Sequence, residues 1–214
     1  MNLFERVKRM KILLINGSPN EKGCTYTALR EAETALIGQG AETELLQIGR
    51  GPVRGCIACG GCREKGRCVF DDDMANEIAD KIAESDGVII GTPVYFAGAN
   101  GTLCALLDRV FYFSGRRFAG KPGAAVVSCR RGGASSAFDR INKYFTISQM
   151  PIVSSVYWNS VHGFTPEDVK KDREGLQVMR YLAYNMAWLI RGLKDAPPAA
   201  AEDKKEFTSF ADGK

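Results

Sequence analysis

The sequence predicts an α/β protein with one doubly wound parallel sheet of five strands. Short apolar runs alternate with stretches whose apolar residues recur at helical spacing, which is the pattern of repeated strand–helix units. The first run, Lys11–Asn16, contains Ile-Leu-Leu-Ile, as parallel strands do when both of their faces are buried. Loops rich in small residues follow several of these runs, and ligands bind at that edge of such a sheet.

The first unit consists of the strand Lys11–Asn16, a loop over Gly17–Thr25 and a helix. The helix is expected directly behind the loop because apolar residues recur there at helical spacing. These residues are Ala28, Leu29, Ala32 and Leu36. The second strand is expected over Glu42–Ile48.

The middle of the chain supplies a helix, a strand and another helix. After a glycine- and cysteine-rich loop over Gly55–Phe70, the segment Asp72–Ala83 is expected to be helical, with acidic residues at its start where they suit the helix dipole. Gly87–Gly91 is the expected third strand, and Thr92–Gly101 is its loop. Thr102–Phe113 follows as a helix with one leucine-rich face.

The last part of the chain supplies two more strands and two more helices. Gly123–Ser128 is the expected fourth strand, and it leads through the loop Cys129–Gly133 into a helix that ends near Ile147. Pro151–Tyr157 is the expected fifth strand. A long closing helix is marked by Met179, Leu182, Met186, Leu189 and Ile190.

These elements predict one domain over residues 11–194, with an N-terminal extension over 1–10 and a mobile tail over 195–214. The 214 residues are 45% hydrophobic, which suffices for a single core. The net charge of +4 is spread along the chain, so no nucleic-acid partner is expected. No apolar run approaches the ~18 residues of a membrane span, and no signal peptide is expected. Seven cysteines then favour a reducing compartment, the cytoplasm.

The loop Gly17–Thr25 predicts an anion site, because it joins a buried strand to a helix N-terminus. It is not a nucleotide loop of the Walker type, since Lys22 precedes Gly23 instead of following it. It also lacks the glycine spacing of the dinucleotide fingerprint. Its hydroxyl groups, Ser18 and Thr25, suit a terminal phosphate monoester. An ordinary capped turn remains the alternative.

Four motifs in this order resemble the NADPH-dependent FMN reductase family, and most closely its iron–sulfur flavoprotein branch. They are GSPNEKGCT, CIACGGCREKGRCVFDDDM, TPVYF and SCRRGG. The resemblance implies a flavodoxin-like sheet of strand order 2-1-3-4-5, non-covalent FMN, NAD(P)H as reductant and a homodimer or homotetramer. Cys24 is a departure, because relatives often have asparagine there.

The resemblance also implies which residues contact the flavin. The phosphate would be held by Ser18, Asn20, Cys24 and Thr25. The isoalloxazine would pack along Pro93, Val94, Tyr95 and Phe96. Its pyrimidine edge would meet Ser128, Arg130, Gly132 and Gly133. No catalytic side chain is expected, because the flavin carries the chemistry. Asp108 and Arg109 are interpreted as a structural ion pair or helix feature.

The loop after the second strand holds four cysteines in the spacing C-x2-C-x2-C-x5-C, namely Cys56, Cys59, Cys62 and Cys68. Zinc ribbons separate their two cysteine pairs by a longer stretch, whereas four ligands this close suit a [4Fe–4S] cluster. A cluster here is expected to lie near the flavin crevice. The alternative is a loop without iron that shapes a subunit interface.

The sequence therefore predicts an FMN-dependent NAD(P)H oxidoreductase that passes electrons to a quinone, a nitro or azo compound, a flavin or a protein. An alternative from another class is an electron carrier that works through the cysteine loop. A third hypothesis is a hydrolase with Cys24 as its nucleophile, based on the C-x5-R spacing to Arg30.

Overall fold

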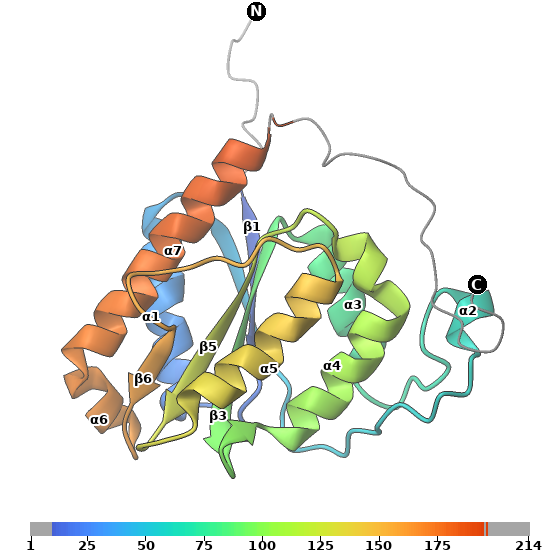
Figure 1. Cartoon of the computed structure of the whole chain (residues 1–214), viewed down its shortest axis with the longest axis horizontal. Coiled ribbons are helices and arrows are strands. Elements are labelled where there is room, and N and C mark those ends of the chain that lie inside the picture. The colour runs from blue at the N-terminus through green and yellow to red at the C-terminus, as the bar shows by residue number, and fades with distance from the viewer. Residues whose placement is uncertain (1–9, 195, 197–214) are drawn as a thin grey trace, which may run out of the picture.

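The computed structural model describes residues 10–194 and 196. The predicted extension and the predicted mobile tail therefore lie outside the described residues, except for Met10 and Ala196. Within the described part, five parallel strands form one sheet in the order β2-β1-β3-β5-β6 (Figure 1). A further short strand, β4, pairs antiparallel with the end of β3. Apart from β4, this is the order 2-1-3-4-5 that the resemblance implies, so the predicted fold class is confirmed.

The strands and helices alternate along the chain as predicted. The strands are β1 (Lys11–Asn16), β2 (Glu42–Gln47), β3 (Gly87–Tyr95), β4 (Gly98–Ala99), β5 (Gly123–Cys129) and β6 (Ser160–His162). The main helices are α1 (Cys24–Gly38), α3 (Ala75–Glu84), α4 (Gly101–Ser114), α5 (Ala134–Ile147) and α7 (Arg173–Lys194). Shorter turns are α2 (Cys62–Lys65), the 3₁₀ helix η1 (Gly115–Phe118) and α6 (Pro166–Lys171).

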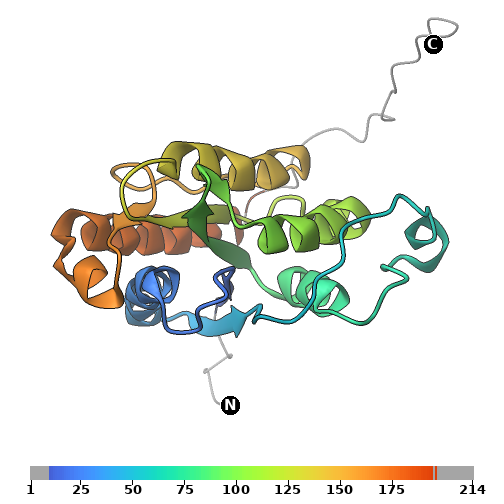
Figure 2. The ribbon, with the colours of Figure 1, turned by 90° about the horizontal axis from the view of Figure 1, so that it is seen from below.

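Alternation of side chains along β1 divides the core into two layers. Ile12 and Leu14 pack with residues of α1 and α7, whereas Leu13 and Ile15 pack with residues of α3, α4 and α5. All four side chains are at most 2% exposed. Figure 2 shows the sheet between these helices. The strand is apolar without interruption because both of its faces are covered.

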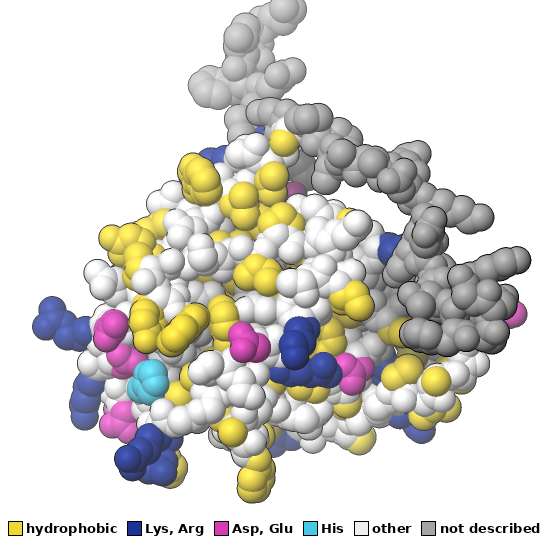
Figure 3. Space-filling model, viewed as in Figure 1, with side chains coloured by type: hydrophobic (Ala, Val, Ile, Leu, Met, Phe, Trp, Pro, Cys, Tyr) yellow, Lys and Arg dark blue, Asp and Glu magenta, His cyan; other side chains and the backbone are white. Residues whose placement is uncertain are grey.

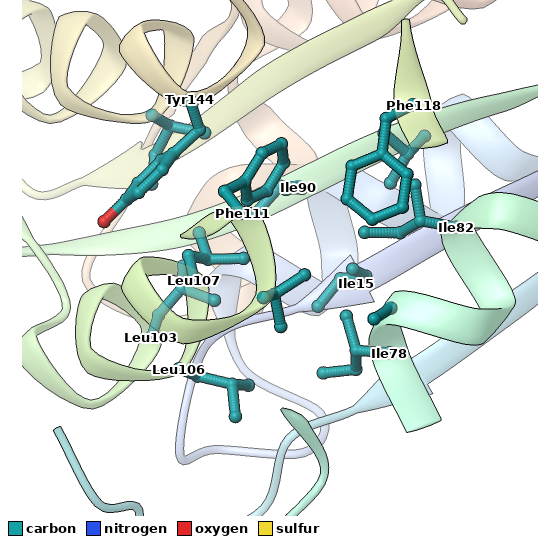
Figure 4. Close-up of a cluster of buried hydrophobic side chains, with 14 of the residues drawn as sticks. Ile15, Ile78, Ile82, Ile90, Leu103, Leu106, Leu107, Phe111, Phe118 and Tyr144 are labelled. Carbon is teal, nitrogen blue, oxygen red and sulfur yellow. The ribbon is translucent and has the colours of Figure 1, made fainter. Parts of the chain in front are cut away.

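Aromatic rings close the layer formed by α3, α4 and α5. The Phe111 ring lies 5.4 Å from the Phe118 ring and 5.2 Å from the Tyr144 ring, centroid to centroid (Figure 4). Edge-on and tilted ring pairs of this kind add to the stabilisation that burial provides. They fix α4 against the sheet, and α4 in turn carries the loops at both of its ends.

The predicted fifth strand over Pro151–Tyr157 is wrong. Only Ile152 forms an isolated bridge there, with Gly123, and the strand at this edge is β6, three residues long. Beyond this bridge the chain leaves the sheet, and the carbonyl of Ser154 accepts a hydrogen bond from Asn185 of α7, 2.8 Å away. The third strand is longer than predicted, because it continues to Tyr95 and turns back into β4.

No helix in the described part of the chain is both long and apolar enough to cross a membrane.

Candidate functional site

The loop between β1 and α1 is held by the last side chains of two strands. Asn16 accepts a hydrogen bond from the backbone N–H of Ser18 at 3.1 Å, and its amide donates to Gln47 at 2.5 Å. Gln47 in turn donates to the carbonyl of Ser18 at 2.6 Å. Asn16 and Ser18 are buried, so the loop has a fixed shape.

The N-terminus of α1 faces this loop without a side-chain cap. Its N-cap residue is Gly23, whose lack of a side chain leaves the first-turn N–H groups for another acceptor. Ser18 Oγ accepts from the N–H of Asn20 at 3.1 Å, and its own proton remains available as a donor. A helix N-terminus that begins at a glycine, next to the buried hydroxyl of Ser18, offers hydrogen-bond donors that suit an anion such as a phosphate.

Thr25 and Ser128 join two of the predicted site loops. Their hydroxyl oxygens lie 2.8 Å apart, and the two residues are 1% and 4% exposed. One hydroxyl proton is used between them, so the pair retains one further O–H to donate. Asn100 makes a second link, because its amide donates to the carbonyl of Gly17 at 2.9 Å.

Arg50, which follows β2, is a residue of this site that sequence reasoning missed. Its guanidinium donates to the carbonyl of Pro19 at 2.9 Å and to Oδ1 of Asn20 at 3.1 Å. It thus fixes exposed Asn20 and adds a positive charge beside the anion loop. The sequence could have indicated this residue, because an arginine between two glycines, Gly49 and Gly51, follows directly after the second strand.

Cys24 begins α1, and its environment disfavours a nucleophilic thiolate. Burial raises the pKa of its thiol, and the carboxylates of Asp168 and Glu167 raise it further. Its Sγ lies 3.8 Å from the carbonyl of Gly163. Arg30 forms an ion pair with Glu33 along the helix. The C-x5-R pattern therefore lacks the depressed thiol pKa that a hydrolase of this kind needs.

The loop after β3 is a tight hairpin. Phe96 and Ala97 link β3 to β4 and both have positive φ angles, 48° and 59°, which is the backbone of a type I′ turn. Residues other than glycine are strained in this region, and such strain concentrates at functional sites. The hairpin holds Phe96 fully exposed and Tyr95 at 44% exposure, whereas Pro93 and Val94 are half-buried.

The loop after β5 packs directly against this hairpin. Gly133 has a φ of 88°, and a Cβ placed on it would lie 2.6 Å from Cα of Ala97, so a side chain has no room there. The neighbouring Arg130 and Gly132 are exposed. The loops after β1, β3 and β5 therefore lie beside one another, through the Thr25–Ser128, Asn100–Gly17 and Gly133–Ala97 contacts. The assignment of the twelve flavin-contacting residues stays a prediction.

The cysteine loop forms a separate site on the flank of α4. All four predicted cysteines line one small hollow, together with Tyr112 and Phe113 of α4. Cys56 and Cys59 are exposed, and Cys62 and Cys68 are half-buried. Asn76 fixes the last of them, because it accepts from the N–H of Cys68 at 2.9 Å and donates to its carbonyl at 3.1 Å.

Arg109 ties this loop to α4. Its guanidinium donates to the carbonyls of Arg54 and Phe70 at 3.1 and 3.2 Å, to Cys68 Sγ at 3.3 Å and to the carboxylate of Asp73. The side chains of Arg109 and Asp73 are only 2% and 4% exposed. A buried charge pair of this kind fixes the loop at both of its ends.

Asp108 and Arg109, interpreted from the sequence as a structural ion pair or helix feature, each form a structural ion pair, but with other partners and not with each other. Consecutive helical residues point in different directions. Asp108 instead accepts from Arg140 at 2.9 Å and from the Tyr144 hydroxyl at 2.5 Å.

The expectation that the cysteines lie near the flavin crevice is not supported. They pack beside Tyr112, whereas the hairpin precedes Gly101 at the other end of α4. At 1.5 Å per residue, these two points are separated by about 16 Å along the helix axis. Figure 1 shows α2 well away from β6 and the end of β3.

The donor set of the cysteine loop fits an iron–sulfur cluster by its chemistry, since four thiols surround one hollow with apolar walls. Their side chains are not gathered into a common coordination sphere. Among the described residues, no three Cys, His, Asp or Glu side chains converge closely enough to hold a metal ion.

Comparison with known proteins adds three findings. The profile of the family described as NADPH-dependent FMN reductase matches residues 10–165. An iron–sulfur flavoprotein of Methanocaldococcus jannaschii is 35% identical over 193 aligned positions, and the alignment covers 86% of this chain and all of the relative. The crystal structure of RosB with a bound riboflavin-phosphate intermediate superposes with a TM-score of 0.67 at 14% identity, over 96% of this chain and 98% of that one.

An archaeal flavodoxin superposes with a TM-score of 0.57 at 14% identity, over 85% of this chain and 99% of that one. At such identities the two structures show the fold alone.

Proposed function

Since the chain belongs to the NADPH-dependent FMN reductase family, in its iron–sulfur flavoprotein branch, we propose that this flavin-dependent oxidoreductase takes hydride from NAD(P)H and passes the electrons to an acceptor. The acceptor is a quinone, a nitro or azo compound, a free flavin or a protein. The observation that carries the proposal is the uncapped start of α1, whose first turn holds Thr25 in a buried hydrogen bond with Ser128.

In this proposal the chain's own residues bind and orient FMN. The backbone N–H groups of Cys24 and Thr25 and the hydroxyl of Ser18 receive the phosphate, with Arg50 holding Asn20 in place. The spare O–H of the Thr25–Ser128 pair donates toward the ribityl phosphate arm. These groups fit a phosphate because they offer hydrogen-bond donors and a positive electrostatic potential. No side chain caps the N-terminus of α1 and competes for the same N–H groups.

The hairpin and the loop after β5 hold the ring system. Pro93, Val94, Tyr95 and Phe96 form one side of its site. Arg130, Gly132 and Gly133 lie at its pyrimidine edge, where a positive charge favours the reduced, anionic flavin. The flavin supplies hydride acceptance and release, so no side chain is needed as acid or base.

A second candidate function is electron carriage through Cys56, Cys59, Cys62 and Cys68. It is favoured by the four thiols around one hollow and by the name of the M. jannaschii relative. These thiolates would hold a [4Fe–4S] cluster, which supplies one-electron transfer when bound. We also propose a homodimer or homotetramer, because Tyr181, Tyr184 and Trp188 of α7 are exposed aromatic side chains at helical spacing.

An absorption spectrum of anaerobically purified protein, followed by steady-state oxidation of NAD(P)H, tests both functions. We expect flavin bands and turnover with an added quinone. A protein that holds flavin but turns over only with a partner reductase is a carrier. A colourless protein that binds no added FMN contradicts both candidates.

A further inference from the structure

A hollow beside the loop after β5 shares only Gly132 and Gly133 with the proposed flavin site. It has a volume of about 230 Å³ and lies between the first turns of α5 and the segment that leads to β6. Gly132 and Gly133 line it, so it adjoins the proposed pyrimidine edge of the flavin. Figure 3 shows this face, with hydrophobic side chains gathered over α7 and the segment before β6.

One wall of this pocket is aromatic. Tyr157 and Trp158 are each 58% exposed, and their ring centroids lie 4.9 Å apart at an interplanar angle of 60°. Phe138 of α5 adds a third ring to the lining. Exposed rings at a pocket wall stack well on nucleobases, because every base presents an aromatic face.

Other residues that line the pocket favour a negatively charged ligand. Arg131 is exposed and, within the described residues, its guanidinium is not part of an ion pair. The 14-residue helix α5 begins beside it, and its N-cap Gly133 provides no side-chain hydrogen bond to the first turn. Ser135 adds a hydroxyl and His162 an exposed imidazole. An arginine next to an uncapped helix N-terminus suits a phosphate.

Asn159 provides an independent indication of a ligand. It lines the pocket and is 1% exposed. Its Oδ1 accepts from Ser155 Oγ at 2.7 Å, but its Nδ2 has no hydrogen-bond partner among the described residues. A buried amide donor without a partner destabilises the fold, and a ligand acceptor removes that penalty.

We propose that this pocket binds the adenosine-phosphate half of the reductant, with adenine on Trp158 and the 2′-phosphate of NADPH at Arg131. The proposal rests on the oxidoreductase function above and makes Arg131 a determinant of cofactor choice. A dinucleotide carries its redox ring at one end and adenine at the other, which matches a pocket adjoining the flavin site. The volume is below the ~300–1,000 Å³ of pockets for whole drug-sized ligands, so the pocket receives only part of the dinucleotide. Arginine is the residue that accommodates a 2′-phosphate in other nucleotide sites.

The test is calorimetric titration of the FMN-loaded protein with adenosine 2′,5′-bisphosphate. We expect saturable binding that weakens about tenfold to a hundredfold in Arg131→Gln, which removes a charge-assisted contact. Trp158→Leu should weaken binding about tenfold through loss of stacking. The matched control Arg116→Gln changes an exposed arginine outside the pocket and should bind as the parent does.

Kinetics with the same variants separates this proposal from the proposed function. Arg131→Gln should raise KM for NADPH, leaving kcat and the KM for NADH unchanged. Absence of bisphosphate binding to the parent, or equal binding by all variants, overturns the pocket assignment even if NADPH is oxidised. Binding that follows the expected pattern in a protein that oxidises no nicotinamide supports an adenylate pocket and refutes the proposed reductase.

Discussion

The Nε–H of Arg109 donates to the Sγ of Cys68 across 3.3 Å, and this contact joins the cysteine loop to the middle of α4. A hydrogen bond and a positive charge at a thiolate are two of the factors that set the potential of an iron–sulfur site. From the sequence, Arg109 was interpreted as part of a structural ion pair or a helix feature. In the structure its partners are Cys68, Asp73 and the carbonyls of Arg54 and Phe70.

Arg109→Leu should lower the free energy of unfolding by about 3–5 kcal/mol, because it leaves the buried carboxylate of Asp73 without its partner. Urea denaturation of the FMN-loaded protein measures this. The matched control is Arg117→Leu, whose partner Asp80 is 53% exposed, and it should cost no more than about 1 kcal/mol. Equal effects of the two substitutions would show that the Arg109 pair is not a structural anchor.

Thr25→Val and Ser18→Ala should each weaken FMN binding about tenfold to a hundredfold, since each removes a hydroxyl donor to a charged phosphate. Titration of flavin-free protein with FMN gives the dissociation constants. Thr34→Val is the control, because its hydroxyl donates to the carbonyl of Arg30 on the same helix. Unchanged affinity in both test variants places the phosphate elsewhere.

Cys24 should contribute through its backbone alone. Because burial raises the pKa of its thiol, less thiolate is present at any given pH. At pH 8 we expect iodoacetamide to modify Cys24 at least about tenfold more slowly in the folded protein than in urea-unfolded protein. Cys24→Ala should retain its FMN. Fast modification, or loss of flavin in that variant, contradicts this role.

Cys59→Ser should abolish iron binding and keep FMN, because the phosphate loop is on another part of the molecule. Anaerobic, reconstituted parent protein should be brown with about four irons per chain. Cys104→Ser, outside the cysteine loop, serves as the control and should keep the iron. Parent protein that is yellow and contains no iron after reconstitution refutes the cluster. The cysteine loop would then be a loop without iron that shapes a subunit interface.

Turnover should be ping-pong, because reductant and acceptor use the same flavin face beside Tyr95 and Phe96 in turn. Initial rates at varied NADPH and quinone should give parallel double-reciprocal lines. Intersecting lines indicate a ternary complex with two separate sites and would exclude this order of events.

The sequence by itself determined four of the five parallel strands and the position of the loop between β1 and α1. The strand at Ile12–Ile15 and the apolar strands after it can be recognised from adjacent residues alone, since burial on both faces of a sheet requires an uninterrupted apolar stretch. The loop motif is equally local, because the N-terminus of α1 follows it within a few residues. The spacing of the four cysteines is also a property of the chain alone.

Tertiary structure decided those features that depend on contacts between residues far apart in the sequence. The carbonyl of Ser154 bonds to Asn185 of α7 and not to a neighbouring strand, and the last strand forms at Ser160–His162 and not where local composition predicted it. Arg109 reaches the cysteine loop, 41 positions away at Cys68, and Thr25 meets Ser128 across 103 positions. Such contacts have no periodic signature, because packing in three dimensions, and not neighbouring residues, selects them.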